Sequence, residues 1–285
     1  MIDLTPFLHH MPAWLMVLAR LSGMFLLTPV LGSATVPVQV KALLVVGLAV
    51  CVYPVLMADA ASAAVLAPAM TGGLSLWTLG PVLGLELLLG YVMGYLVMLP
   101  LAGLQTGGHI IGQQMGIGIG GVYNPELDGE AGVIGQFLFL LGLVVFLQLG
   151  GHHAVFAVLV GSFRHVPLGG FTDLAMVLEV AVGLVSVMME LAVRVAAPLM
   201  ALLFLESVAM GFLARTVPQM NILSIGFALR ILITSVVLIA LIPVIGGLAE
   251  DGVVDAVRRM AGLVEHVEPG LWREAPPTPS GGGGF

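Results

Sequence analysis

Ionisable side chains inside apolar runs are the residues of this chain best placed to do chemistry. A charge buried in hydrocarbon is costly, so such residues usually pair with one another or serve transport. Glu190 and Arg194 stand four residues apart with the acid first, the favourable order for an ion pair on one helix. We expect these two to neutralise each other, with a transport role as the alternative. The others lack a local partner and are expected to pair with other helices or subunits: Arg20, Glu86, Glu206 and Arg230.

A glycine-rich polar stretch over residues 107–135 interrupts apolar sequence on both sides. Backbone that is neither helix nor barrel survives at membrane depth only when protein buries it or it lines a wet cavity. We therefore expect a pore, gate or binding site here. Gly116, Gly118 and Gly121 satisfy G-x-G-x-x-G, but they follow an apolar span and lead into a turn. A dinucleotide site needs a preceding strand and a following helix, so we interpret these glycines as pliable backbone.

The signals for catalysis or metal binding are weaker. His152 and His153 are adjacent, with no Cys, Asp or Glu at ligand spacing, so a polar helix end or interface explains them better than a metal. The alternating acids, Glu126, Asp128 and Glu130, lack EF-hand spacing and are expected to form a solvated rim. No nucleophile elbow, P-loop or HExxH motif occurs. We predict no enzyme, cofactor or metal, and an intramembrane hydrolase using the histidines is a distant alternative.

Composition places the chain in the membrane class. Of its 285 residues, 59% are hydrophobic and only 9% are charged, against roughly 25% charged in an average soluble domain. The net charge is -7 and no basic cluster occurs, which argues against a nucleic-acid partner. The single cysteine, Cys51, excludes a disulfide within one chain.

Apolar segments must carry these polar groups, and a helix crossing the hydrocarbon needs about 20 residues. Candidate segments cover residues 11–31, 38–57, 74–104, 133–160, 174–213 and 222–248. The fifth is either two pieces or one long helix that extends past any bilayer. Residues 263–285 have the proline and glycine content of a disordered tail. We predict an all-α, membrane-associated protein of long kinked helical hairpins.

Proline and glycine refine this expectation. Pro100, Pro198 and Pro243 lie inside apolar runs, where each removes a backbone donor and predicts a kink or break. Small residues four apart let helix backbones approach closely in a membrane. The pairs Gly80 and Gly84, and Gly90 and Gly94, have this spacing and are expected at helix interfaces.

Short motifs follow one another along the chain in a definite order. They are ARLSGMF at 19–25, PVLG at 29–32, IIGQQMGIGIG at 110–120, NP at 124–125, GQFL at 135–138, GGHHAVF at 150–156, SFRHVPLG at 162–169, APL at 197–199 and VPQMNI at 217–222. Together they resemble the FliR family, the export-gate subunit of the flagellar type III secretion system, which is homologous to the SctT subunit of virulence injectisomes. The resemblance covers roughly residues 10 to 250.

The resemblance implies an architecture and a set of partners. Residues 1–172 would form a FliP-like half and residues 173–262 a FliQ-like hairpin, in one spiral with FliP and FliQ subunits. That spiral would dock with FlhB and FlhA in the bacterial inner membrane, as part of the flagellar basal body, and stand largely outside the bilayer plane.

The resemblance also implies roles for residues. The loop at about 112–132 would be the plug that closes the channel for unfolded flagellar proteins. Polar residues Arg215, Gln219 and Asn221 would lie in a partner-facing turn. The plug residues are Gln113, Gln114, Met115, Gly116, Gly118, Gly120, Gly121, Asn124 and Pro125.

Two other functions remain as alternatives. The equivalent subunit of a virulence injectisome would share the fold and differ in cargo. A secondary transporter would need a midplane site between inverted repeats, and we find no internal repeat.

Overall fold

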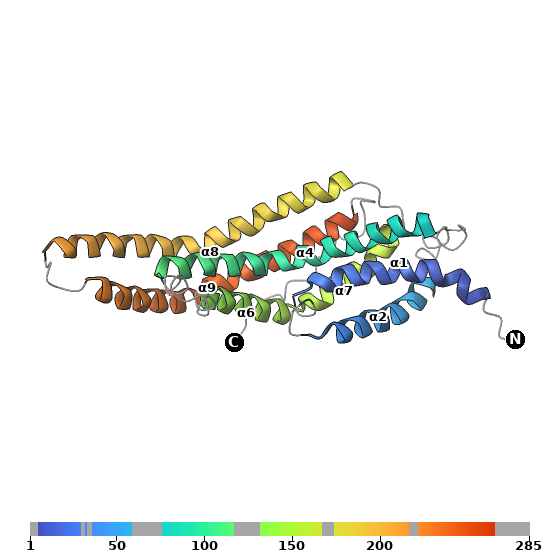
Figure 1. Ribbon diagram of the computed structural model, residues 1–285, viewed down its shortest axis with the longest axis horizontal. Coiled ribbons are helices and arrows are strands. Elements are labelled where there is room, and N and C mark those ends of the chain that lie inside the picture. The colour runs from blue at the N-terminus through green and yellow to red at the C-terminus, as the bar shows by residue number, and fades with distance from the viewer. Residues whose placement is uncertain are drawn as a thin grey trace, which may run out of the picture.

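The computed structural model describes residues 5–29, 32, 36–58, 76–116, 132–166, 174–216 and 222–265. Within these ranges the regular structure is helical, without a strand, and the predicted all-helical class is confirmed (Figure 1). The helices are α1 (Thr5–Leu27), α2 (Val38–Ala58), α4 (Leu76–Met115), α6 (Val133–Gln148), α7 (Gly151–His165), α8 (Leu174–Thr216) and α9 (Ile222–Glu265).

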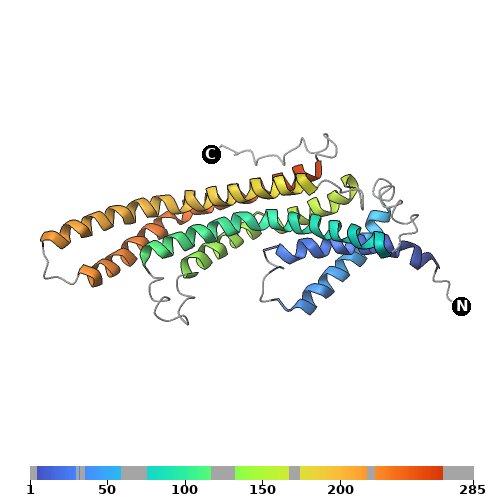
Figure 2. The same cartoon turned by 45° about the horizontal axis from the view of Figure 1, so that its top comes forward.

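Helix α4 is the central rod, because it contacts α1 on one flank and α6, α8 and α9 on others. Helices α8 and α9 lie side by side as a long hairpin, and the end of α8 and the start of α9 project beyond the other helices (Figures 1 and 2). With 43 and 44 residues, each is roughly 65 Å long at about 1.5 Å per residue. The hydrocarbon core of a bilayer is only about 30 Å thick. The fifth apolar segment is therefore one long helix, the second of the two expected forms.

None of the three prolines breaks its helix. Pro100 lies inside α4, Pro198 inside α8 and Pro243 inside α9, and each helix continues on both sides. In Figure 1 the yellow and orange parts of α8 run in different directions, so this helix bends. A long packed helix tolerates a missing donor because its neighbours hold both arms in place.

One expected span is instead a corner. The apolar run 133–160 divides into α6 and α7, which are bent by 66° relative to each other. Gly150 sits at the break with φ of +67°, in the left-handed region. That conformation is easy for glycine and strained for other residues, so the glycine permits the turn. His152 and His153 lie in the first turn of α7.

Glycine also sets the contact between α1 and α4. A β-carbon built on Gly90 would lie 1.9 Å from the carbonyl oxygen of Arg20, and one on Gly94 would lie 2.5 Å from that of Met24. The interface predicted for Gly90 and Gly94 is confirmed. Gly80 and Gly84 meet no atom of the described chain within 4 Å of an added β-carbon, so they form no close helix contact within it, and their interface role stays a prediction.

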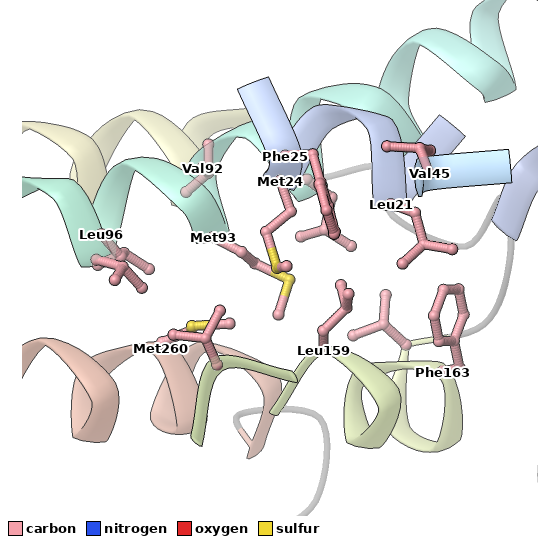
Figure 3. Close-up of a cluster of buried hydrophobic side chains, with 14 of the residues drawn as sticks. Leu21, Met24, Phe25, Val45, Val92, Met93, Leu96, Leu159, Phe163 and Met260 are labelled. Atoms are coloured by element: carbon pink, nitrogen blue, oxygen red, sulfur yellow. The ribbon is translucent and has the colours of Figure 1, made fainter. Parts of the chain in front are cut away.

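Two apolar clusters fill the interior. Figure 3 shows the first, in which side chains of α1, α4, α7 and α9 meet, among them Leu21, Met24, Met93, Leu159 and Met260. The second joins α4 to α6, α8 and α9 and includes Leu104, Ile111, Met115, Leu138, Leu199 and Ile245. Among the described residues, 5 helices are long and apolar enough to cross a membrane, or 6 if α6 and α7 count as one span.

The close α1–α4 contact yields a prediction with a matched control. Gly90→Ala should destabilise the protein by about 2 kcal/mol, because overpacking at a backbone contact outweighs the gain in helix propensity. Gly84→Ala should leave stability unchanged or slightly raised, since its β-carbon meets open space. Thermal unfolding of the purified variants measures this, with a midpoint for Gly90→Ala roughly 5 °C below that of wild type. Equal midpoints for the two variants would contradict the packing argument.

Candidate functional site

Arg20 is the most deeply buried charge of the described chain. Its side chain is 0% exposed, and its Nε donates to Glu86 Oε2 at 2.6 Å, joining α1 to α4. Its Nη1 donates to Ser162 Oγ at 3.1 Å and its Nη2 to the carbonyl oxygen of Val166 at 3.3 Å. The guanidinium also stacks on Phe163, with 4.4 Å from Cζ to the ring centroid. A single side chain thus ties α1, α4 and the end of α7 together.

The second buried carboxylate, Glu206 of α8, pairs with Arg230 of α9. Its side chain is 3% exposed, and its Oε2 receives Arg230 Nη2 at 3.0 Å and Nε at 3.1 Å. Arg230 Nη2 also donates to Ser207 Oγ at 2.9 Å, and its Nη1 donates to the carbonyl oxygen of Gln114 at 3.2 Å.

Residues 107–115 of the glycine-rich stretch belong to α4, and the glycine-rich segment that remains between α4 and α6 comprises residues 116–132. The loop expected from residue 112 starts later, because the helix continues through Met115. Met115 is only 3% exposed and packs in the second core, whereas Gln113 and Gln114 are exposed. This burial holds the last turn in helix despite the nearby glycines. Gly116 then leaves the helix with φ of +78°, which glycine adopts without strain.

The two helices that flank the glycine-rich segment pack closely against each other. A β-carbon on Gly108 of α4 would lie 2.6 Å from the Cα of Gly135 in α6. A β-carbon on Gly135 would meet the ring of His109 at 3.0 Å. Helices α4 and α6 therefore touch closely, and both contribute side chains to the second core.

Glu190 and Arg194 differ from the buried charges. Their side chains are 59% and 62% exposed, and Arg194 Nη2 lies 2.6 Å from Glu190 Oε1 on the same face of α8. They form a surface pair within the described chain, beside a groove between α4, α8 and α9 whose wall also includes Asp251. An exposed pair of this kind contributes little to stability.

Several expected site residues fall outside the described ranges. These are the plug residues Gly118, Gly120, Gly121, Asn124 and Pro125, the acids Glu126, Asp128 and Glu130, and the turn residues Gln219 and Asn221. Arg215 is described and is exposed in the last turn of α8.

The histidine pair does not form a metal centre with described residues. The rings of His152 and His153 are 4.1 Å apart between centroids, and His152 Nδ1 is buried without a hydrogen-bond partner in the described part of the chain. In the same ranges no group of three His, Cys, Asp or Glu side chains is arranged to hold a metal ion.

Sequence reasoning missed Ser162, Phe163 and Val166 as partners of Arg20, and Ser207 and the Gln114 carbonyl as partners of Arg230. Arg20 lies 66 residues from Glu86 and 142 from Ser162 along the chain. No local spacing signals such pairs, and only the paucity of charge in apolar sequence indicated that partners were needed.

The buried and the exposed ion pair should differ in how much stability the protein loses when the arginine is replaced. Arg20→Gln removes the cation that pairs with the buried Glu86 carboxylate at 2.6 Å, which should cost about 3–5 kcal/mol. The matched change Arg194→Gln breaks an exposed pair and should cost less than about 1 kcal/mol. Replacing both partners, in Arg20→Met with Glu86→Leu, should recover much of the loss. Thermal unfolding of the three variants tests this, and an Arg20→Gln protein as stable as Arg194→Gln would refute it.

Comparison with known proteins matches this architecture to a family. The family model described as "Bacterial export proteins, family 1" matches residues 11–255. The flagellar biosynthetic protein FliR of Bacillus subtilis (strain 168) is 31% identical over 164 residues, which are 56% of this chain and 63% of the relative. FliR of Escherichia coli (strain K12) is 28% identical over 64% of this chain and 70% of its own length.

A relative from another secretion system also matches. The Yop proteins translocation protein T of Yersinia pestis is 24% identical over 57% of this chain and 63% of its own length. The aligned region thus spans less than two thirds of the Bacillus and Yersinia relatives. The family model nonetheless covers nearly all of the helical part, from α1 into α9. The chain therefore belongs to family 1 of the bacterial export proteins, the family of FliR.

Proposed function

We propose that this chain is the FliR subunit of a flagellar type III export gate, where it helps form and close the channel through which unfolded flagellar proteins leave the cell. Membership of an export-protein family makes it a component of an export apparatus and not an enzyme. The observation that carries the gate role is the arrangement of the described residues that flank the glycine-rich segment. Helices α4 and α6, which flank it, are locked together at Gly108 and Gly135, and the chain leaves α4 at Gly116 in a left-handed conformation.

The chemistry of the segment suits a closure. Glycine backbone adopts conformations that are sterically unfavourable for other residues, so it can fill an irregular gap and move aside for a passing chain. Gln113 and Gln114 present uncharged polar side chains where the segment starts. In the proposal, Gly118, Gly120, Gly121, Asn124 and Pro125 complete the plug, and buried Met115 holds its base in the second core.

Exposed apolar faces support an assembled state. Large apolar patches on a protein surface mark contact with lipid or other proteins. On the α8–α9 hairpin Phe204, Leu205, Phe212 and Ile239 are all exposed. We propose that FliP and FliQ subunits cover these faces in the core complex, and that FlhB and FlhA dock on the assembly. Arg215, Gln219 and Asn221, around the α8–α9 turn, would face partners.

The proposed halves follow the same division. A FliQ-like hairpin over residues 173–262 requires two long antiparallel helices, and α8 and α9 have this form. Residues 1–172, with α1 to α7, would then be the FliP-like half. The apolar helices and the family make this a multi-pass membrane protein. We propose the bacterial inner membrane, at the flagellar basal body, as its location.

One second function has an observation in its favour. The similarity to the Yersinia translocation protein supports the equivalent subunit of a virulence injectisome. The two functions share a mechanism and differ in cargo, so neighbouring genes for flagellar or for virulence components discriminate between them.

Assembly gives the first test of the proposal. When the chain is expressed with FliP and FliQ from the same organism, affinity purification should recover the three proteins as one complex. The exposed apolar faces should then be covered, whereas the chain alone should aggregate. Recovery of a monodisperse single chain, with FliP and FliQ present but unbound, would argue against the gate.

Removal of the plug gives the second test. Deleting residues 116–121 should leave the complex assembled and make the membrane leak ions and small solutes, because the missing backbone no longer fills the channel. Conductance of cells or of proteoliposomes bearing the complex measures this. Co-purification with FliP and FliQ verifies that the chain with this deletion still assembles. Unchanged permeability with assembly intact would contradict the plug role.

A further inference from the structure

We infer that Arg230 is a positioning residue that fixes the end of α4 to the α8–α9 hairpin and so sets the direction in which the chain enters the glycine-rich segment. The bond that indicates this joins Arg230 Nη1 of α9 to the carbonyl oxygen of Gln114, residues separated by 116 positions, at 3.2 Å. The link is an observation about described residues. Only its consequence for ion leakage rests on the proposed function.

The end of α4 supplies an acceptor that needs a donor. The last carbonyl groups of a helix have no partner within the helix and must find one elsewhere. Here the amide of Gly116 donates to the carbonyl oxygen of Gln113 at 3.0 Å. The next carbonyl, that of Gln114, receives Arg230 instead. A cation at a helix C-terminus is also favoured by the helix dipole, so both the charge and the donor geometry of Arg230 suit this place.

Glu206 and Ser207 hold Arg230 in position. Arg230 Nε and Nη2 both reach Glu206 Oε2, at 3.1 Å and 3.0 Å, and Nη2 also donates to Ser207 Oγ at 2.9 Å. The planar guanidinium is thereby fixed by α8 on one side, which aims Nη1 at α4. Glu206 Oε1 is buried and has no hydrogen-bond partner in the described chain. A guanidinium used only for this carboxylate would engage both oxygens, whereas this one divides its donors between two helices.

The competing explanation is an ordinary pair that stabilises the α8–α9 hairpin. The two explanations differ in what happens when both charges are removed together. Replacing a buried ion pair by apolar side chains of similar size is often neutral or stabilising. Such a variant keeps α8 packed on α9 but leaves the Gln114 carbonyl without its donor. The hairpin would survive and the end of α4 would loosen.

The test uses the full chain in its complex with FliP and FliQ. The variants are Glu206→Leu with Arg230→Met, Arg230→Lys alone, and Arg259→Gln as control. Arg259 lies on the same helix and pairs with Asp255 at 2.7 Å, on the surface and within one helix. Amide hydrogen exchange of residues 113–116 reports on the end of α4, and exchange of residues 203–207 and 230–236 reports on the hairpin.

In the double apolar variant the amide hydrogens of residues 113–116 should exchange at least about 10-fold faster than in wild type. The amides of the hairpin should exchange at wild-type rates. Arg230→Lys should also raise exchange at 113–116, since one ammonium nitrogen replaces three guanidinium nitrogens that are divided among three partners. Arg259→Gln should leave both regions at wild-type rates. Wild-type exchange at 113–116 in the double variant, or in Arg230→Lys should the double variant fail to assemble, would overturn the inference.

Ion leakage separates this inference from the gate itself. Faster amide exchange at residues 113–116 in the double apolar variant, together with ion leakage through its complex, supports the link and its role in closure. Faster exchange without leakage supports the link and counts against the gate. Wild-type exchange at 113–116, in a complex that leaks once residues 116–121 are deleted, overturns the link and leaves the gate standing.

Discussion

The packing of this chain depends on one constraint, that the buried Arg20 guanidinium must find charged and polar partners. In an apolar interior an unpaired charge would cost several kcal/mol, and Glu86, Ser162, Phe163 and the Val166 carbonyl together relieve that cost. These partners come from α4 and from the end of α7, so α1 must lie where it touches both. Glycine makes this possible, because at Gly23 and Gly90 the backbones of α1 and α4 are in contact. Charge and close packing therefore determine the same arrangement.

Helix α4 connects this fixed point to the candidate site. Glu86 lies in the first third of the helix and Gln114 near its end, and 114 − 86 = 28 residues at about 1.5 Å each separate them by roughly 42 Å. At one end α4 is held by Arg20, and at the other by Arg230. The glycine-rich segment thus starts from a rod that is restrained at both ends. In the proposed gate role the segment would need such a base, since a loop can seal a passage only if its two attachment points are held.

Sequence reasoning succeeded where the signal was local or compositional. Apolar runs predicted the helices, and the spacing of Glu190 and Arg194 predicted their pair on one helix face. It failed where tertiary packing decided. Burial of Ile111 and Met115 extends α4 past its glycines, and Gly150 turns an apparent single span into a corner. Partners of Arg20 and Arg230 come from distant parts of the chain, so no spacing rule could identify them.

The central claim, that the glycine-rich segment lies on the export passage, is tested most directly by crosslinking to a polypeptide in transit. A photoreactive residue is placed at Gln113 or Gly118, and export is arrested with a cargo fused to a stably folded domain. The account predicts crosslinks from both positions to the arrested cargo, and none from Val50, which is exposed on α2. Crosslinks from Val50, or their absence at Gln113 and Gly118 while the cargo is arrested, would contradict it.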